Sequence, residues 1–252
     1  MIRVAIVGGA GRMGRALVAA VLESPACTLT GVTEHAGHAL IGQDVGTALG
    51  HGALGVTFAD RPHAVMARCD VVIDFTAPEA SVVHAACAAE EHVPLVIGTT
   101  GFSTEQLTGL RKTAAHTAIL LSPNMSIGVN LFWHVAERLA NVCGGDYAIR
   151  IDETHHVHKK DAPSGTAKKL RELVTAAAGR TPESVRMQSY REGEVIGDHT
   201  ITFESPGDVI TIRHQAKERV IFARGAVAAA QWLVGKPAGR YAMADMLGLT
   251  KP

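Results

Sequence analysis

The sequence predicts an α/β protein in which a doubly wound parallel sheet is followed by a smaller α+β domain. Short, almost fully apolar runs alternate with helix-patterned segments through the first half of the chain, which is typical of a parallel sheet covered on both faces. A glycine-rich turn directly follows the first apolar run. After Pro123 the segments become rich in β-branched residues, and no helix pattern separates the last two, which indicates antiparallel pairing.

The first half of the chain is expected to form five strands separated by helices. Apolar, β-branched runs predict the strands, and apolar residues recurring at helical spacing predict the helices. The expected strands are 2–7, 28–33, 71–75, 95–97 and 118–121, and the expected helices are 13–22, 80–91 and 104–115.

The second half is expected to begin with a polar crossover and to end in an alanine-rich helix. The crossover is 124–130, the helices are 131–141, 168–178 (with Gly179 as C-cap) and 225–233, and the strands are 147–154, 199–204 and 209–214. The predicted domains are therefore 1–126 with 220–252, and 127–219.

The composition is that of an ordinary globular protein. The 252 residues carry 24 basic and 24 acidic side chains and are 47% hydrophobic, which excludes disordered and fibrous proteins. Because the net charge is zero, the protein has no overall positive potential that would attract nucleic acid. No run of residues approaches the ~18 apolar residues that a membrane span needs. The four cysteines form no C-x-x-C pair. We therefore expect a soluble cytoplasmic protein with reduced thiols and with no nucleic-acid or membrane partner.

The glycine-rich turn has the spacing of a dinucleotide-binding fingerprint. Gly9-Ala10-Gly11-Arg12-Met13-Gly14 follows an apolar strand and begins a helix, as the G-x-G-x-x-G motif requires. In this pattern Gly9 permits the sharp turn, Gly11 lets a pyrophosphate approach the backbone, and Gly14 allows close packing of helix and strand. The motif predicts a Rossmann-type domain that binds a nicotinamide dinucleotide.

The residues after the second predicted strand indicate which dinucleotide is used. Glu34, about 20 residues after the turn, is the expected acceptor for the adenosine ribose hydroxyls. Its charge would repel the 2′-phosphate of NADPH, whereas His35 is a partial phosphate partner only when it is protonated. NADH is therefore the expected cofactor, with residual use of NADPH.

Two further turns follow apolar strands, at the edge where open α/β sheets bind ligands. They are Asp74-Phe75-Thr76 and Gly98-Thr99-Thr100-Gly101-Phe102. The hydroxyls of Thr99 and Thr100 are expected near the nicotinamide carboxamide or ribose. Ordinary turn chemistry is the alternative for both segments.

Residues 153–166 hold the densest chemistry of the chain, and three interpretations compete. In the first, His156 and His158 share a strand face and chelate a metal, although zinc-like spacing is absent. In the second, the segment is a solvated charged loop. In the third, it is an anion-binding and proton-donating site, because imidazoles transfer protons near neutral pH and lysines bind carboxylates.

The end of this segment supports the third interpretation. Ser164 or Thr166 is suited to cap the helix that follows, and the N–H groups of Gly165 and Thr166 would then face a bound carboxylate. A domain that supplies hydride, together with a cationic pocket that supplies protons, indicates reduction of a small acidic substrate.

These residues carry a resemblance that spans nearly the whole chain. The sequence resembles the 4-hydroxy-tetrahydrodipicolinate reductase family, formerly called dihydrodipicolinate reductase, and His155-His156-Val157-His158-Lys159-Lys160-Asp161-Ala162-Pro163-Ser164-Gly165-Thr166 is the specific signature. The other matching segments are Gly8 to Gly14, Asp74 to Thr76, Gly98 to Phe102, and Asn124-Met125-Ser126-Ile127-Gly128-Val129-Asn130.

The resemblance implies a homotetrameric enzyme of lysine and diaminopimelate biosynthesis, in which the second domain binds substrate and forms the oligomer. It would reduce a cyclic imine dicarboxylate with NADH or NADPH and without a metal. His155 would donate or accept the proton and Lys159 would be the second donor, while His156, Gly165 and Thr166 would hold the substrate carboxylates.

The same resemblance implies which residues bind the cofactor. They are Gly8, Gly9, Ala10, Gly11, Arg12 and Met13 along the nucleotide, Glu34 and His35 at the adenosine ribose, Gly98, Thr99 and Thr100 near the nicotinamide, and Ser122, Pro123, Asn124 and Met125 beside it.

Three departures from the family pattern are visible. Met125 replaces a common Phe, His35 stands where many members have Arg, and the segment before Gly197 is shorter than in some members. Two other functions remain open: a related dehydrogenase acting on an amino-acid semialdehyde or diamino acid, and a regulator that binds NADH without catalysis.

Overall fold

The computed structural model describes residues 1–250, and the chain divides into two compact units. The first unit is Met1–Ser126 together with the chain from Phe222 onward, and the second is Ile127–Ile221. The chain therefore crosses between the units twice, just before α6 (Ile127–Cys143) and inside the first turn of α8 (Val220–Leu233).

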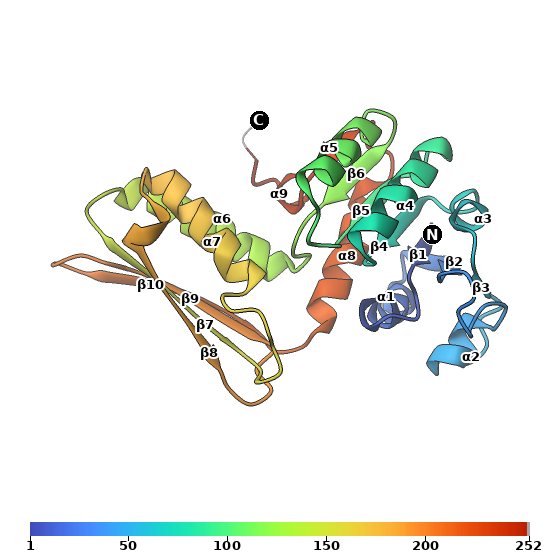
Figure 1. Cartoon of the computed structure of the whole chain (residues 1–252), viewed down its shortest axis with the longest axis horizontal. Coiled ribbons are helices and arrows are strands. Elements are labelled where there is room, and N and C mark those ends of the chain that lie inside the picture. The colour runs from blue at the N-terminus through green and yellow to red at the C-terminus, as the bar shows by residue number, and fades with distance from the viewer. Residues whose placement is uncertain (251–252) are drawn as a thin grey trace. The chain divides into compact units, whose positions relative to one another are not determined.

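A seven-stranded parallel sheet forms the centre of the first unit (Figure 1). Its order is β11-β6-β5-β4-β1-β2-β3, so the chain winds outward from β1 in both directions, and the prediction of a doubly wound parallel sheet is confirmed. The strands are β1 (Ile2–Val7), β2 (Cys27–Thr33), β3 (Phe58–Ala59), β4 (Val71–Asp74), β5 (Leu95–Ile97), β6 (Ala118–Leu121) and β11 (Gly239–Tyr241).

Helices cover both faces of this sheet because its strands are apolar on both sides. Val4 and Ile6 of β1 pack in one core with residues of α1 and α8, whereas Ala5 and Val7 pack in another with residues of α3, α4 and α5. The remaining helices of this unit are α1 (Arg12–Glu23), α2 (Val45–Leu49), α3 (Pro62–Met66), α4 (Pro78–Glu90), α5 (Thr104–Thr113) and α9 (Met243–Met246).

The second unit is a four-stranded mixed sheet with two helices against one face. The order is β10-β9-β7-β8, in which β9 pairs antiparallel with both neighbours and β7 pairs parallel with β8. The expected antiparallel pairing of the last two strands is confirmed. The elements are β7 (Ala148–His155), α7 (Gly165–Ala178), a 3₁₀ turn (Pro182–Ser184), β8 (Val185–Arg191), β9 (Gly197–Glu204) and β10 (Val209–Ala216).

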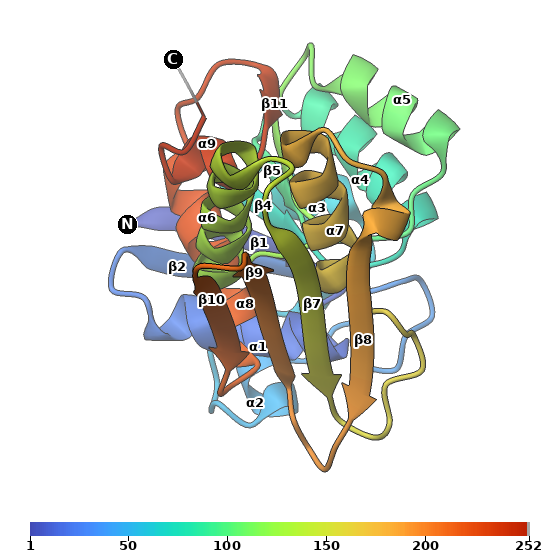
Figure 2. The same cartoon turned by 90° about the vertical axis from the view of Figure 1, so that its left-hand side faces the viewer.

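Alternation along β7 gives this sheet one buried and one open face. Ile149 and Ile151 join the core beneath α6 and α7, while Arg150 and Asp152 point to the other side and pair with each other at 2.9 Å. Figure 2 views the sheet from this open face, with α6 and α7 behind it. The face carries polar and charged side chains and is not covered by a helix of this unit.

Two details differ from the sequence-based expectation. Helix α6 begins at Ile127, so the expectation that residues 127–130 form part of a non-helical crossover is wrong. The polar residue Asn130 lies in the first turn of this helix. Strand β8 was not expected, because its charged and polar residues conceal the period-two pattern of a strand. Gly179 forms the left-handed C-cap of α7, as predicted.

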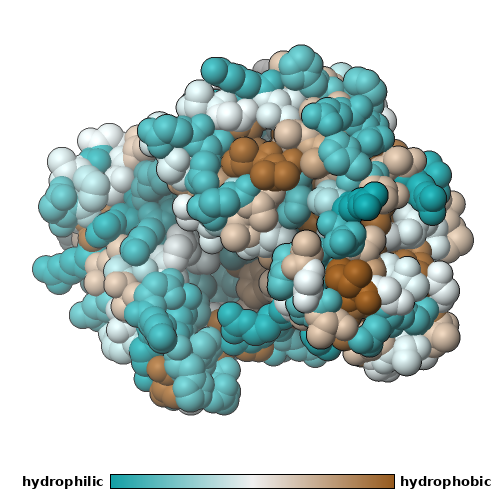
Figure 3. All heavy atoms as spheres, turned by 45° about the vertical axis from the view of Figure 1, so that its right-hand side comes forward, coloured by the Kyte–Doolittle hydropathy of each residue, from teal (hydrophilic) through white to brown (hydrophobic). Residues whose placement is uncertain are grey.

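The surface and the thiols agree with the composition. All four cysteines are free and buried. On the face shown in Figure 3, hydrophobic residues form separate patches among polar ones. None of the helices within residues 1–250 is long and apolar enough to cross a membrane.

Candidate active site

The glycine-rich turn joins β1 to α1 and leaves no room for side chains. Gly8 has a φ of +73°, a region that favours glycine, so the sharp turn falls at Gly8 and the expectation that Gly9 makes it is wrong. Gly9 instead packs on β2, since a Cβ there would lie 2.1 Å from Cγ1 of Val32. A Cβ on Gly14 would lie 2.2 Å from the Gly8 carbonyl oxygen, so this glycine lets the helix pack closely on the strand.

The helix begins where the motif predicts. Gly11 is the N-cap residue of α1, and Arg12 and Met13 are its first two residues. The free N–H groups and the positive end of the helix dipole therefore lie at the turn, which is the arrangement that favours a pyrophosphate.

Glu34 reaches this turn from the end of β2. Its Oε1 accepts a hydrogen bond from the Ala10 N–H at 2.8 Å, and its Oε2 accepts one from the His35 N–H at 3.3 Å. A hollow of about 450 Å³ lies beside them, lined by Gly8, Gly11, Glu34, His35 and residues of the neighbouring strand ends. A glycine-rich turn, a helix N-terminus and a carboxylate beside such a hollow fit a nicotinamide dinucleotide.

Asp60 also lines this hollow, which the sequence analysis did not anticipate. It follows β3, a strand of only two residues that is too short to give a sequence pattern. Two carboxylates, those of Glu34 and Asp60, therefore line the same hollow. Both would repel an additional phosphate.

Asp74, at the end of β4, is fully buried and organises the next strand end. Its Oδ1 accepts hydrogen bonds from the N–H and the hydroxyl of Thr76, at 2.9 and 2.7 Å, and its Oδ2 lies 2.9 Å from Nδ1 of His84. The buried Thr99 hydroxyl accepts a hydrogen bond from Ser81 at 2.8 Å and lies 3.4 Å from Asp74. The Thr99 hydroxyl is thus occupied by hydrogen bonds to Ser81 and Asp74. Only the backbone of Thr99 is left as a candidate for cofactor binding.

The neighbouring glycine and threonine have different surroundings. A Cβ on Gly98 would lie 2.2 Å from the Phe75 ring, so this glycine lets Phe75 pack against the strand end and line the cofactor hollow. Thr100 is exposed.

The stretch from Ser122 to Met125 forms the turn after β6. The Ser122 hydroxyl donates to the carbonyl oxygen of Asn124 at 2.8 Å, and Pro123 between them is exposed. Met125 is 1% exposed and packs in the core with Gly225 against its carbonyl oxygen. The Met125 side chain therefore lies in the core. Only the backbone of Met125 is left as a candidate for contact with the nicotinamide.

In the second unit, the signature segment is organised around a buried carboxylate, that of Glu153 on β7. Glu153 is 1% exposed, and its Oε1 accepts hydrogen bonds from the Ser164 N–H at 2.9 Å and from the Ser189 hydroxyl at 2.8 Å. Burial alone would raise the pKa of Glu153, but the interactions with His155, Ser164 and Ser189 outweigh burial and hold this pKa well below its ordinary value. The group is therefore a carboxylate at neutral pH.

Two buried imidazoles lie against the other oxygen of this carboxylate. Oε2 is 3.3 Å from Nδ1 of His155 and 3.7 Å from Nε2 of His199, and the two rings make an edge-to-face contact. Burial, and then the charge of His155, lower the pKa of His199 to about 4. His199 was not among the predicted residues. The period-two pattern of β9 places His199 on the same buried face as Ile201 and Phe203, and this is the signal that could have identified it.

Lys159 lies in the loop after β7, where Arg191 holds the backbone. The Arg191 Nε donates to the Lys159 carbonyl oxygen at 3.1 Å, another guanidinium nitrogen donates to the carbonyl of Asp161, and a third lies 3.9 Å from Glu153. The Lys159 ammonium pairs with the Asp161 carboxylate at 2.8 Å, and this hydrogen bond holds the pKa of Asp161 below its ordinary value. The lysine side chain is three-quarters buried.

Helix α7 begins at the end of the signature segment. Ser164 is the N-cap, and its hydroxyl accepts a hydrogen bond from the Ala167 N–H at 3.1 Å, so Ser164 rather than Thr166 caps the helix. Gly165 and Thr166 form its first turn, and a Cβ on Gly165 would meet open space. This helix N-terminus is therefore a place where a substrate carboxylate can approach backbone N–H groups.

The strand-face interpretation of the histidines is wrong. Strand β7 ends at His155, so His156 and His158 lie in the following turn. His156 is partly buried; burial, and then the positive charge of Arg219, lower its pKa. A neutral imidazole there can donate a hydrogen bond to a carboxylate.

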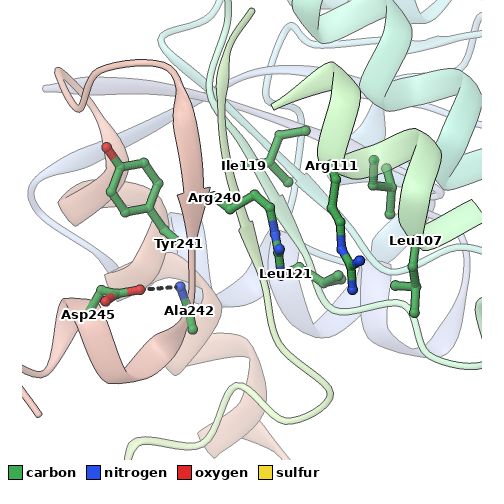
Figure 4. A pocket seen from close by; sticks show the side chains of 9 residues that line it. Leu107, Arg111, Ile119, Leu121, Arg240, Tyr241, Ala242 and Asp245 are labelled. Carbon is green, nitrogen blue, oxygen red and sulfur yellow. Dashed lines mark hydrogen bonds between the residues drawn. The ribbon is translucent and has the colours of Figure 1, made fainter. Parts of the chain in front are cut away.

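Another hollow, of about 400 Å³, lies in the first unit between α5, β6, β11 and the start of α9. Figure 4 shows Arg111 and Arg240 entering it from α5 and β11, with Leu107 and Ile119 nearby. None of the predicted site residues lines it, so it is separate from the cofactor hollow.

Family models cover the chain on both sides of the crossing between the units. The model described as dihydrodipicolinate reductase, N-terminus, matches residues 2–125, and the one described as dihydrodipicolinate reductase, C-terminus, matches residues 128–247.

Curated relatives extend the similarity over the full length. The chain is 42% identical to 4-hydroxy-tetrahydrodipicolinate reductase of Geobacter metallireducens, covering 99% of this chain and 100% of the relative. It is 43% identical to the enzyme of the same name from Anaeromyxobacter dehalogenans, covering 99% and 98%.

Among solved structures, the chain is similar to dipicolinate-bound dihydrodipicolinate reductase from Paenisporosarcina sp. TG-14. The TM-score is 0.80 at 24% identity, covering 97% of this chain and 98% of the other. An amine dehydrogenase from Mycobacterium smegmatis has a TM-score of 0.70 at 15% identity, covering 95% and 94%. At these identities the two structures show the fold.

Proposed function

The chain belongs to the dihydrodipicolinate reductase family, and we propose that it carries out the family reaction with the pocket built around Glu153, His155 and Lys159. The reaction is the NAD(P)H-dependent reduction of 4-hydroxy-tetrahydrodipicolinate to tetrahydrodipicolinate, in the diaminopimelate route of lysine biosynthesis. The single observation that carries the assignment to this pocket is the set of contacts of Glu153. Its carboxylate lies against His155, accepts a hydrogen bond from the Ser164 N–H at the start of α7, and is near Arg191, which holds the backbone of Lys159. Imidazole, ammonium and helix N-terminus are the groups that reduction of a dicarboxylate requires.

The first unit is assigned to the cofactor. A reduced nicotinamide supplies the hydride when it is bound. Gly8 to Met13 would hold the pyrophosphate on the helix N-terminus and Glu34 would accept the ribose hydroxyls. The turns at Gly98 to Thr100 and Ser122 to Met125 would contact the nicotinamide end.

NADH is proposed as the preferred cofactor. Glu34 and Asp60 place two negative charges at the ribose hollow, and His35 is the residue there that can meet a phosphate when protonated. The 2′-phosphate of NADPH would therefore be bound more weakly than the free hydroxyl of NADH.

The second unit is assigned to the substrate and to the proton. His155 is proposed to exchange the proton with the reduced ring, with Lys159 as the second donor, because imidazole and ammonium groups are suited to proton transfer. Gly165 and Thr166 at the start of α7, together with His156, would hold the carboxylates.

A homotetramer in the cytoplasm is proposed as the working state. The open face of the second sheet supports the proposal, because no helix of this unit covers it and it carries charged side chains such as the paired Arg213 and Asp198. Native mass spectrometry of the full chain would test this: four-chain particles are expected, and monomers alone would contradict it.

The activity is tested in a coupled assay that generates the unstable imine substrate in the reaction mixture. Pyruvate, aspartate semialdehyde and a separate condensing synthase produce it, and loss of reduced-nicotinamide absorbance is followed with NADH and NADPH in parallel. Oxidation that needs both enzymes, and is faster with NADH, is expected. No oxidation despite measurable NADH binding would contradict the activity, and turnover of a semialdehyde or diamino acid instead would assign a related dehydrogenase.

A further inference from the structure

We propose that Glu153 is a positioning residue for the reaction: its buried carboxylate holds Nδ1 of His155 and thereby presents Nε2 to the substrate. The inference rests on the proposed function, in which His155 exchanges the proton.

The two oxygens of Glu153 have different surroundings. Oε1 already accepts two hydrogen bonds, from the Ser164 N–H at 2.9 Å and from the Ser189 hydroxyl at 2.8 Å. Oε2 and the His155 Nδ1 are both buried and lack a hydrogen bond of standard geometry, and they lie 3.3 Å from each other. Each is therefore the partner available to the other, and the contact needs only a small adjustment to become a hydrogen bond.

His199 also lies near Oε2, but it does not form an ion pair with Glu153 at neutral pH. Its Nε2 is farther away, at 3.7 Å, and burial followed by the charge of His155 lowers its pKa to about 4. His199 is therefore neutral at physiological pH. Its edge-to-face contact with the His155 ring limits rotation of that ring.

The opposite side of the His155 ring is kept bare by a glycine. A Cβ on Gly197 would lie 3.2 Å from Nε2 of His155, a distance at which a side chain crowds the nitrogen. The ring thus contacts Glu153 at Nδ1, and the glycine leaves room beside Nε2. In the neutral state this arrangement requires the proton on Nδ1, because Oε2 can only accept.

Glu153 also joins the other predicted substrate residues to this histidine. Through the Ser164 N–H it fixes the start of α7, where Gly165 and Thr166 lie, and through Arg191 it connects to the backbone of Lys159. A carboxylate with 1% exposure and several charged or polar neighbours would be costly to bury without such a role.

The test is the protonation pattern of His155 and its change in Glu153→Gln. In this variant the two donors at Oε1 hold the amide oxygen there, so the amide NH₂ is turned toward Nδ1. A donor facing Nδ1 forces the neutral ring into the form protonated on Nε2. Nitrogen-15 NMR at alkaline pH distinguishes the two forms, and His155→Gln identifies the signal among the 13 histidines.

We expect neutral His155 to carry its proton on Nδ1 in the wild-type chain and on Nε2 in Glu153→Gln. We expect kcat of this variant to fall at least about tenfold with KM within about threefold, because a proton transfer step is impaired. Glu153→Asp keeps the charge and should recover part of kcat. Glu172→Gln, an exposed carboxylate on α7, is the matched control and should leave kcat, KM and the His155 signal unchanged.

A wild-type His155 protonated on Nε2 would overturn the inference, and this result needs no variant to fold. A normal kcat in a folded Glu153→Gln, or a lost kcat with an unchanged His155 signal, would overturn it as well. Wild-type protein that binds NADH but fails to reduce the imine would instead contradict the proposed function, since the NMR measurement does not depend on turnover.

Discussion

His35 shows how much one side chain contributes to cofactor choice. It lines, with Glu34 and Asp60, the same hollow, so the local charge is negative whether or not the imidazole is protonated, and protonation only reduces it. In the proposed binding mode the pyrophosphate would contact backbone atoms, and NADH and NADPH share that group. The choice between NADH and NADPH is therefore a question of side-chain charge at this one place.

Replacing His35 with Arg should shift the preference toward NADPH. A guanidinium is always charged and can pair with a phosphate through two hydrogen bonds, which imidazole cannot do. We expect the ratio of kcat/KM for NADPH over NADH to rise at least about tenfold, mainly through a lower KM for NADPH. Steady-state kinetics with both cofactors measures the ratio.

The matched control is His38→Arg, since His38 packs edge-to-face against His35 but does not line the hollow. It should change the ratio little. An unchanged ratio in His35→Arg would show that the 2′-phosphate lies elsewhere.

Single residues also show where sequence reasoning ends. Glu153 lies two residues before the signature segment, and its spacing from His155 places both side chains on one strand face. Nothing in the sequence says that Ser189 and His199 complete the cluster. Those partners come from β8 and β9, more than 30 residues away along the chain. Long-range pairing of strands creates this contact, and one sequence does not reveal the register.

Among the elements, α7 links a local capping signal to substrate binding. Its N-cap, Ser164, uses its hydroxyl for the helix and its N–H for Glu153. The start of the helix is therefore fixed from both the helix side and the pocket side. Helix α5 begins with Ser103 in a complete capping box, and its first turn lies outside the candidate site.

Ser164→Ala and Ser103→Ala form a matched pair of capping variants. Each removes one side-chain cap and should lower the free energy of unfolding by about 1 kcal/mol. Only Ser164→Ala should also raise the KM for the dicarboxylate, because it loosens the turn that presents Gly165 and Thr166. Urea denaturation and steady-state kinetics on both variants test this; equal KM values would remove the start of α7 from substrate binding.

Two of the strands that sequence reasoning missed, β3 and β11, lie at the two edges of the first sheet. Strand β3 has only two residues, and β11 has no fully buried residue, so neither gives an apolar run. The central strands of the first sheet were predictable because they are buried on both faces and read as apolar runs. Prediction was therefore best where burial is complete.

For the whole molecule, the buried His199 predicts how stability depends on pH. Its pKa is about 4 in the folded chain and near 6.5 when unfolded, so the unfolded chain binds more protons between these values. The contribution to stability is complete above about pH 6.5 and is lost as the pH falls toward 4. At about 1.4 kcal/mol per pH unit, the loss is about 3 kcal/mol.

Glu153 acts in the same direction at lower pH. Its pKa lies below the ordinary value in the folded chain, so its stabilising effect is present above that ordinary value and declines as acid protonates the group. Urea unfolding at pH 7.5 and 5 should show the loss in the wild-type chain and a smaller loss in His199→Gln. Equal losses would mean that His199 is not the group responsible.

The most direct test of the proposed chemistry is His155→Gln in the coupled assay. Glutamine keeps the polar character of the position but cannot exchange a proton near neutral pH. We expect kcat to fall at least about a hundredfold with only a modest change in KM, because proton transfer belongs to the transition state. A kcat equal to that of the wild-type chain would contradict the assignment of the proton to the pocket of Glu153, His155 and Lys159.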